Sequence, residues 1–373
     1  MIYLDSAATS LLKPKSVETA MVNALHFMAS CGRGSHGAAM RAADKVYECR
    51  ELIGELFNFR QTERIVFTMN ATQALNIAIK SLVRSSDRVV ISGYEHNSVT
   101  RVLTDAKANI AVINTSLFDS DASLEGFRNS LRGAELAVIN HVSNVFGFVQ
   151  PLYEIAEICK REGIPLTVDA SQSSGICDID AERLDAAFIA MPGHKGLLGP
   201  QGTGVLLCGA EPKPILLGGT GSDSVLQTMP DYLPDRLEAG THNVVGIAGL
   251  AEGVRYVLRK KSEIIGRYEK HLCDIAARNL QGIDGLEVFH TEENCQAGVL
   301  SIRHESIDSE GLCRELGKRG VAARCGLHCA PLAHKTAGTL DTGTLRLSFS
   351  PFVSEKQVIT AVNTVKNVIV HKK

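Results

Sequence analysis

The sequence predicts an α/β protein with a mainly parallel central sheet and a smaller α+β domain. Strand-like and helix-like segments alternate from about residue 40 to residue 210. The strand-like segments are short, rich in Val and Ile and apolar at successive positions, which is typical of strands covered by helices on both faces. After Thr241 the pattern changes to long helices and fewer strands, which indicates a second domain. We expect a large domain over residues 15–243 and a small domain formed by residues 1–14 and 244–373.

Seven segments of the first part are predicted as strands of the central sheet, because each is short and apolar. They are Arg64–Thr68, Arg88–Ser92, Asn109–Ile113, Glu135–Asn140, Pro165–Asp169, Ala186–Ala190 and Gly204–Cys208. Four helices are predicted before and between these strands: Ala42–Phe57, Ala71–Val83, Asn97–Lys107 and Leu152–Arg161. In the first helix, the spacing of Val46, Leu52, Ile53 and Leu56 gives one apolar face.

The second part is predicted to begin with one long helix from Val244 to about Leu280, which joins the two domains. Alternating short elements follow it. They are the strands Leu286–Phe289 and Gly298–Ile302, the helix Ser309–Lys318, the strand Leu345–Phe349 and the helix Ser354–Val370.

Composition excludes several classes of protein. The net charge of −2 gives no reason to expect a nucleic-acid partner. No run of 18 apolar residues and no signal-peptide pattern occurs, so neither a membrane span nor export is expected. The ten cysteines form no C-x-x-C pair, which is typical of free thiols in a reducing cytoplasm. Cys325, His328 and Cys329 have spacing that zinc accepts, but no second ligand cluster completes a site, so no metal is expected.

Lys195 is the first candidate catalytic residue. It stands in the segment Gly193-His194-Lys195-Gly196, directly after an apolar strand. A lysine held there can bind an aldehyde cofactor as a Schiff base. Most lysines are solvated surface residues, so the interpretation depends on a second group.

Asp169 supplies that second group, because it closes a strand 26 positions before Lys195. A carboxylate at the end of a buried strand is costly unless it has a partner. A protonated pyridine nitrogen is such a partner, so the two residues together suggest pyridoxal phosphate. The alternative is an aspartate that caps a helix.

The segment Asn70-Ala71-Thr72-Gln73 opens a predicted helix and is a candidate phosphate site. Backbone N–H groups at Ala71 and Thr72 and the Thr72 hydroxyl can hold phosphate at a helix N-terminus. A plain N-cap is the alternative interpretation.

Two further candidates lie near the C-terminus. Cys329 follows Arg324 and His328 in a loop, where positive charge can lower the pKa of a thiol, although an inert loop thiol is equally compatible with the pattern. Arg346 lies inside the apolar strand Leu345–Phe349, where its guanidinium suits either a bound carboxylate or a structural salt bridge.

Taken together, these motifs resemble the class V, fold-type I pyridoxal phosphate enzymes, and specifically the cysteine desulfurases. The nearest branch is the group II (SUF-type) desulfurases and selenocysteine lyases. The resemblance runs from Tyr3-Leu4-Asp5-Ser6-Ala7-Ala8 to beyond Arg346. The most specific matches, in chain order, are His141-Val142-Ser143-Asn144-Val145-Phe146-Gly147, Val168-Asp169-Ala170-Ser171-Gln172, Gly193-His194-Lys195 and Arg236-Leu237-Glu238-Ala239-Gly240-Thr241.

The resemblance implies a role for each cofactor-binding residue. Lys195 would hold pyridoxal phosphate and act as acid and base, while Asp169 would pair with the pyridine nitrogen. Gln172 would contact the phenolic oxygen of the ring, and His96 would stack on its face. The remaining ligands would be Asn144 at the substrate amine or carboxylate, Ala71, Thr72 and His194 at the phosphate, and Thr241 from the neighbouring subunit of a homodimer.

The resemblance also implies the reaction. Arg346 would bind the carboxylate of L-cysteine, with Arg324 as a second substrate-binding residue. Cys329 would attack the substrate sulfur and keep it as a persulfide, which releases L-alanine. A sulfur-acceptor protein, and through it iron–sulfur cluster assembly, would then be the destination of the sulfur.

The sequence departs from the family pattern at four positions. Pro192, Cys325 and Leu327 replace two hydroxyl residues and a histidine, and Gln73 replaces a glutamate. These changes leave open the sulfur-or-selenium preference, one phosphate ligand, and whether Cys325 forms a disulfide with Cys329 or resolves its persulfide. A selenocysteine lyase, a cysteine-sulfinate desulfinase or another class V lyase or aminotransferase therefore stands as the alternative.

Overall fold

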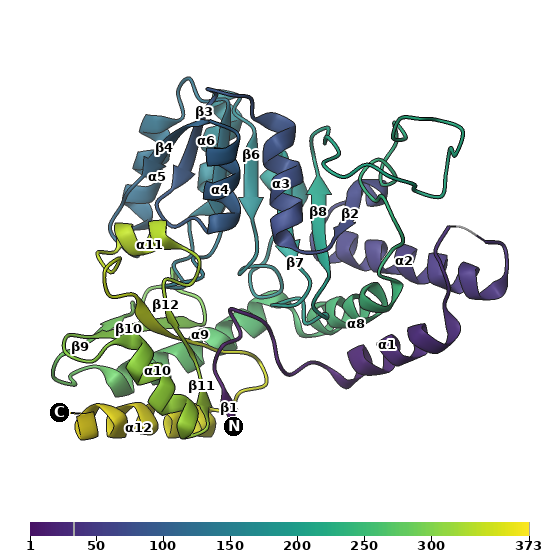
Figure 1. Cartoon of the computed structure of the whole chain (residues 1–373). Coiled ribbons are helices and arrows are strands. Elements are labelled where there is room, and N and C mark those ends of the chain that lie inside the picture. The colour runs from purple at the N-terminus through teal and green to yellow at the C-terminus, as the bar shows by residue number, and fades with distance from the viewer. Residues whose placement is uncertain (33, 373) are drawn as a thin grey trace.

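The computed structural model describes residues 1–32 and 34–372 and has two unequal parts (Figure 1). The larger part contains the central sheet, and the smaller part lies below it in the view with both chain termini. The chain passes between the two parts more than once. The N-terminal strand β1 (Ile2–Tyr3) lies in the smaller part, where it pairs with β11 (Val321–Ala322). Leu4 accordingly packs in the core of the smaller part.

The central sheet has seven strands in the order β2-β8-β7-β6-β5-β3-β4. All neighbouring pairs are parallel except those of β8, which runs antiparallel to both β2 and β7. The strands are β2 (Ile65–Thr68), β3 (Arg88–Ser92), β4 (Asn109–Ile113), β5 (Leu136–Asn140), β6 (Leu166–Asp169), β7 (Phe188–Pro192) and β8 (Gly204–Cys208). The mainly parallel sheet that the sequence predicts is therefore present.

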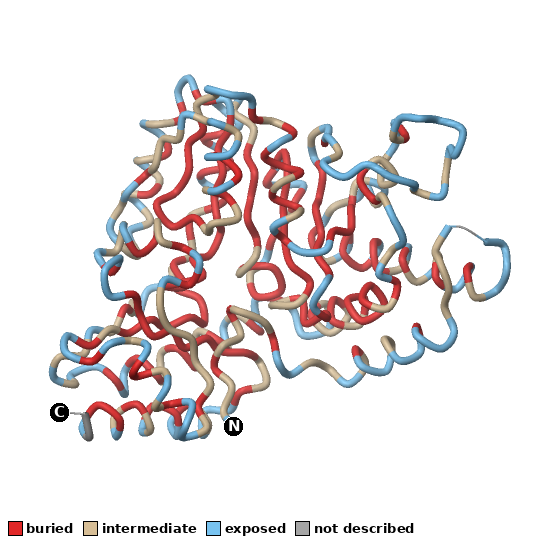
Figure 2. Tube along the Cα trace, viewed as in Figure 1, coloured by how far each residue is buried: buried red, intermediate tan, exposed pale blue. Residues whose placement is uncertain are grey.

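Helices cover both faces of this sheet, which explains why its strands are apolar at successive positions (Figure 2). One face packs against α3 (Ala71–Leu82) and α4 (Asn97–Asp105). The other packs against α2 (Gly37–Leu56), α5 (Ser120–Ser130), α6 (Leu152–Glu162), α7 (Ala181–Leu184) and α8 (Val244–Lys260). The helix α1 (Lys15–Phe27) packs outside, against α8.

The smaller part is built on a four-stranded antiparallel sheet in the order β12-β13-β10-β9. Its helices bury Leu345 and Leu347 of the second strand. The elements are β9 (Leu286–Phe289), β10 (Val299–His304), β12 (Arg324–Gly326), β13 (Thr344–Ser348), α9 (Ser262–Leu280), α10 (Ser309–Lys318), α11 (Pro331–Thr336) and α12 (Glu355–Lys372), with a short 3₁₀ helix, η1 (Thr62–Arg64), in the larger part.

The observed elements follow the predicted order, with two kinds of difference. The single helix predicted from Val244 to Leu280 is wrong, because Lys261 adopts φ of +68° and divides it into α8 and α9. The sequence prediction also named no element at β1, α1, α5, α7, β11, β12 or α11, and five of these have six residues or fewer. The domain boundary at residue 244 stays a prediction, but the buried side chains of α8 belong to the core of the larger part.

Within the residues that the structure describes, no helix combines the length and the apolar composition needed to cross a bilayer.

Candidate active site

A cavity of about 210 Å³ lies at the carboxyl ends of β3, β5, β6 and β7, where ligands bind in open α/β sheets. The edge of the small sheet, through β12 and β13, closes its other side. Eleven of the twelve predicted site residues line it: Ala71, Thr72, His96, Asn144, Asp169, Gln172, His194, Lys195, Arg324, Cys329 and Arg346. Residues separated by up to 275 positions in the chain thus meet at one place.

Lys195 is held in a tight turn directly after β7. Its neighbour Gly196 approaches the backbone so closely that a Cβ there would lie 2.2 Å from the carbonyl oxygen of Ser174. The carbonyl of Lys195 accepts a hydrogen bond from the N–H of Leu198, 2.9 Å away. Burial lowers the pKa of the Lys195 ammonium to about 8, although the nearby Asp169 carboxylate opposes the shift. A fraction of Lys195 is therefore neutral, and so nucleophilic and basic, near neutral pH.

Asp169 is the last residue of β6 and is buried. Its Oδ1 accepts a hydrogen bond from the N–H of Ser171 at 2.9 Å. This contact fixes the carboxylate in the strand–turn junction that the sequence suggested. The carboxylate faces the same cavity as Lys195, so it is available to a cationic ring nitrogen there.

His96 is the N-cap of α4, and its Nδ1 accepts a hydrogen bond from the N–H of Ser98 at 3.0 Å. Burial lowers the pKa of this imidazole, with Asp169 opposing the shift and Lys195 adding to it. The ring is thus neutral at pH 7. Because Nδ1 is an acceptor, the proton of the neutral ring lies on Nε2.

The first turn of α3 brings Ala71 and Thr72 to the cavity. First-turn N–H groups have no partner inside their own helix and attract anions. The Thr72 hydroxyl lies 2.9 Å from the hydroxyl of Ser98, which lines the same cavity. This end of the cavity therefore suits a phosphate group.

Two amide side chains, Gln172 and Asn144, line the cavity. Gln172 donates from Nε2 to the carbonyl of Ala7 at 3.0 Å. Asn144 donates from Nδ2 to the carbonyl of His328 at 2.8 Å, while its buried Oδ1 has no hydrogen-bond partner. Since a buried acceptor without a donor is costly, Asn144 Oδ1 is suited to accept from a bound ligand.

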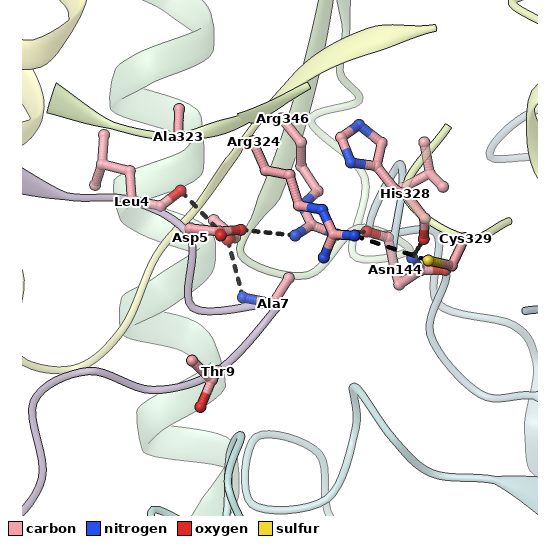
Figure 3. A network of polar contacts seen from close by, with 12 residues as sticks. Leu4, Asp5, Ala7, Thr9, Asn144, Ala323, Arg324, His328, Cys329 and Arg346 are labelled. Carbon is pink, nitrogen blue, oxygen red and sulfur yellow. Dashed lines mark hydrogen bonds and ion pairs between the residues drawn. The ribbon is translucent and has the colours of Figure 1, made fainter. Parts of the chain in front are cut away.

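Arg346 already has two partners in this structure (Figure 3). Its Nη1 donates to the carbonyl of Asn144 and its Nη2 to Asp5 Oδ1, each at 2.8 Å. The side chain is only 1% exposed, so the ion pair with Asp5 compensates a buried charge. The structural salt bridge left open by the sequence is therefore present, although the guanidinium also lines the cavity.

Cys329 lies at the mouth of the cavity, in the loop between β12 and α11. Its backbone has φ of +58°, and its side chain is exposed. Nη2 of Arg324 lies 3.7 Å from its Sγ (Figure 3). Arg324 is thus the cation that can stabilise a thiolate here.

The sequence also suggested His328 as a source of positive charge, and this is wrong. His328 is buried, and its Nε2 lies 3.2 Å from both the carbonyl and the hydroxyl oxygen of Thr344. Burial, with Arg346 nearby, lowers the pKa of its imidazole far below 7. The ring is therefore neutral.

His194 lines the cavity and contacts the N-terminal segment. Its Nδ1 is 3.1 Å from the hydroxyl of Thr9, and its carbonyl accepts from the N–H of Ser10 at 2.9 Å. Burial and the neighbouring Lys195 lower the pKa of the imidazole to about 4. A neutral ring can still hydrogen-bond an anion as a donor.

Thr241 is the one predicted residue that this chain does not bring to the cavity. It lines a separate pocket of about 180 Å³ with Gln73 and Glu238. It belongs to the segment 209–243, which has no helix or strand and extends away from the body in Figure 1. Within one chain, the cavity is therefore built without Thr241.

Sequence reasoning assigned no role to four residues that shape the cavity. They are Asp5, Ser98, Asn140 and Ser171. Asp5 stands in the quoted motif Tyr3-Leu4-Asp5, but only the fold reveals its partner Arg346. Across residues 1–32 and 34–372, no group of three or more His, Cys, Asp or Glu side chains is arranged to hold a metal ion.

Comparisons with known proteins agree with this site. The family model for class-V aminotransferases matches residues 2–360. A probable cysteine desulfurase of Pyrococcus abyssi is 30% identical over 99% of this chain and 94% of its own length, and one of Methanothermobacter thermautotrophicus is 31% identical over 96% and 92%.

Solved structures show the same relation. The apo structure of a cysteine desulfurase from Thermococcus onnurineus NA1 superposes with a TM-score of 0.90 at 31% identity, covering 99% of this chain and 95% of that one. The expected fold type I is thereby confirmed. The chain belongs to the class-V aminotransferase family and, within it, to the cysteine desulfurases.

Proposed function

We propose that this chain uses pyridoxal phosphate to convert L-cysteine to L-alanine and transfers the sulfur to Cys329 as a persulfide. One observation carries the proposal: Lys195, Asp169 and the exposed Cys329 line a single cavity. Family membership supports the reaction, and the cavity supports the assignment of residues.

The residues of the cavity fit this cofactor. Lys195 offers an amine for the aldehyde, Asp169 a carboxylate for the ring nitrogen, and the first turn of α3 an anion site for the phosphate. The Ser98 hydroxyl lies beside Thr72 at that end, and we propose that it takes the place of the hydroxyl that the family has where this chain has Pro192. When bound, pyridoxal phosphate supplies a reactive aldehyde and a ring that accepts electrons from the substrate α-carbon.

Lys195 is the proposed base at the substrate α-carbon. Its pKa of about 8 means that a usable fraction is neutral at pH 7 to 8. The same group, once protonated, returns the proton. His96 remains neutral over this range, and its Nε2–H is available to orient the substrate or the ring.

Cys329 is the proposed nucleophile. Its thiolate attacks the sulfur of L-cysteine, the carbon–sulfur bond breaks, and the sulfur stays on Cys329 while the carbon skeleton leaves. Arg324, 3.7 Å from the thiol, stabilises the negative charge before the attack. Arg346 and Arg324 together give the cavity the positive charge that the substrate carboxylate requires.

A homodimer is proposed as the active unit. The resemblance implies that Thr241 reaches the phosphate of the neighbouring subunit, and in one chain Thr241 lies outside the cavity. Exposed large apolar side chains on the contacting helices α1 and α2 support a partner surface, since grouped exposed apolar side chains mark interaction sites. They include Val22, Leu25 and Phe27 of α1, and Met40 and Tyr47 of α2.

The test is mass spectrometry of the cofactor-loaded protein after treatment with L-cysteine. We expect the mass of one sulfur atom on Cys329, and neither on Cys325 nor on Cys295, together with release of alanine. Cys329→Ala should abolish the added sulfur but keep the absorbance band at roughly 420 nm, whereas Lys195→Ala should lose both. Unchanged alanine release by Cys329→Ala would indicate a lyase that needs no thiol at this position.

A further inference from the structure

Two half-buried cysteines that the proposed reaction does not use lie against each other in the smaller part. Cys313 belongs to α10 and Cys325 to β12. The Sγ of Cys313 donates to the carbonyl of Ala323 at 3.3 Å, so this thiol lies over the start of the strand that carries Cys325. The neighbouring Cys325 thiol contributes to raising the pKa of Cys313, and both residues pack against the core of the small sheet.

The strand geometry separates this pair from the active site. Successive side chains of a strand point to opposite faces of its sheet. Arg324 is paired with Arg346 and lines the cavity, whereas Cys325 is paired with Leu345, which is buried on the helix-covered face. Cys325 therefore faces Cys313 and not Cys329. The link between Cys325 and Cys329 that the sequence left open is not favoured by this geometry.

We propose that Cys313 and Cys325 form a reversible dithiol–disulfide pair, which closes on reaction with low-molecular-weight disulfides and does not include Cys329. The Cys325 thiolate attacks the small disulfide, forms a mixed disulfide and releases one small thiol. The Cys313 thiolate then attacks the Sγ of Cys325 and releases the second. Two protein thiols are oxidised and one small disulfide is reduced, so the exchange balances.

The bond would join α10 to β12, the strand that positions Arg324 beside Cys329. It would therefore connect the redox state of the surroundings to an element of the active site. Burial, together with the neighbouring Cys325 thiol, raises the pKa of Cys313 to about 12. Because the attacking species is a thiolate and Cys313 is half-buried, closure should be slow at pH 7 and faster at higher pH.

Peptide mapping tests the pair without any need for cofactor or substrate. The full chain is treated with 2-hydroxyethyl disulfide, its free thiols are alkylated, and it is digested with trypsin without reduction. Cys313 lies in the tryptic peptide 304–314, but Cys325 and Cys329 share the peptide 325–335. The mapping is therefore repeated with Cys325→Ser, Cys329→Ser and Cys313→Ser.

We expect a cross-link between the two peptides in the wild type and in Cys329→Ser, reversed by dithiothreitol and formed faster at pH 9 than at pH 7. It should be absent in Cys325→Ser and Cys313→Ser, while Cys295→Ser, a half-buried thiol elsewhere, should retain it. A cross-link that persists in Cys325→Ser, or a wild type that carries only separate mixed disulfides, would overturn the proposal. Fragment ions of the wild-type cross-link identify the bonded cysteine even where a variant does not fold.

Discussion

The ion pair between Asp5 and Arg346 places a guanidinium that is 1% exposed beside a carboxylate that is 21% exposed. The pair connects the N-terminal segment to β13 at the edge of the cavity. Because the charge of Arg346 is almost wholly removed from water, its partner matters more than a surface partner would.

The variant Asp5→Asn tests how much the carboxylate partner of Arg346 contributes to stability. The amide keeps the shape and a hydrogen-bond acceptor but leaves the buried guanidinium uncompensated. We expect a loss of ~2–3 kcal/mol in the free energy of unfolding, measured by urea denaturation. Glu18→Gln is the control, since the Lys15–Glu18 pair is exposed and should contribute less than ~0.5 kcal/mol. Equal effects of the two variants would contradict the structural role of Asp5.

Arg324 provides a second test at residue scale. Its guanidinium is 3.7 Å from Cys329 Sγ, in a partly exposed position where a charge contact is worth up to about 1 kcal/mol. Arg324→Gln should therefore slow alkylation of Cys329 by iodoacetamide by about fivefold at pH 7, while Arg324→Lys should retain most of the rate. Cys295, whose thiol contacts Phe118 and Glu293 instead of an arginine, is the internal control for the reactivity of iodoacetamide in each variant. A Cys329 rate unchanged in Arg324→Gln would remove Arg324 from the activation of the thiol.

At the scale of elements, the turn after β7 depends on close backbone contact. A Cβ on Gly196 would meet the carbonyl oxygen of Ser174 at 2.2 Å and the turn would have to move. We expect Gly196→Ala to lower the free energy of unfolding by ~2 kcal/mol and to weaken the cofactor absorbance, because Lys195 is displaced. Gly317→Ala in α10 meets no atom within 4 Å and should be neutral or stabilising by up to ~1 kcal/mol. A fully loaded, stable Gly196→Ala protein would show that the turn tolerates the shift.

The helix α9 carries a buried carboxyl, Glu269, which is 7% exposed. Burial raises its pKa from 4.5 to about 8, so between these values the folded state keeps a proton that the unfolded state releases. This contribution to stability is complete below pH 4.5 and declines as the pH rises towards 8.

Glu269→Gln should remove that pH dependence. The stability of the variant relative to the wild type should increase by at most ~1.4 kcal/mol per pH unit between pH 5 and 8, measured by urea denaturation at several pH values. Glu263→Gln in the first turn of the same helix is exposed and should show no such trend. Parallel curves for Glu269→Gln and the wild type would mean that Glu269 is charged in the folded protein.

At the scale of the whole molecule, the proposed dimer makes a prediction about mixed subunits. Lys195→Ala and Thr241→Ala chains should each be impaired alone, the second through weaker cofactor retention. If Thr241 serves the neighbouring site, a hybrid dimer has one site with both residues intact. Unfolding and refolding an equal mixture should then recover about one quarter of the wild-type activity, by random pairing into closed two-fold dimers.

The activity recovered after mixing distinguishes a Thr241 that serves the neighbouring site from one that serves its own. Recovery no greater than the average of the separate variants would mean that Thr241 serves its own chain or none. Size-exclusion chromatography of Leu25→Asp, on the exposed face of α1, provides an independent check, because a charge at the proposed interface should shift the protein towards monomer.

The sequence by itself determined most of the strands and long helices of the larger part and their succession along the chain, because buried strands and amphipathic helices leave periodic apolar patterns. It also determined the residues at the strand ends, such as Asp169 and Lys195, since the carboxyl edge of a parallel sheet collects them. Local spacing is sufficient for both.

Only the tertiary structure decided which groups meet across the molecule. It pairs Asp5 with Arg346, turns Cys325 towards Cys313, and buries His328 so that its ring stays neutral. It also leaves Thr241 outside the cavity of its own chain. These outcomes depend on burial and on contacts between distant segments. The apolar periodicity of a segment specifies neither how far a side chain is desolvated nor which distant group it faces.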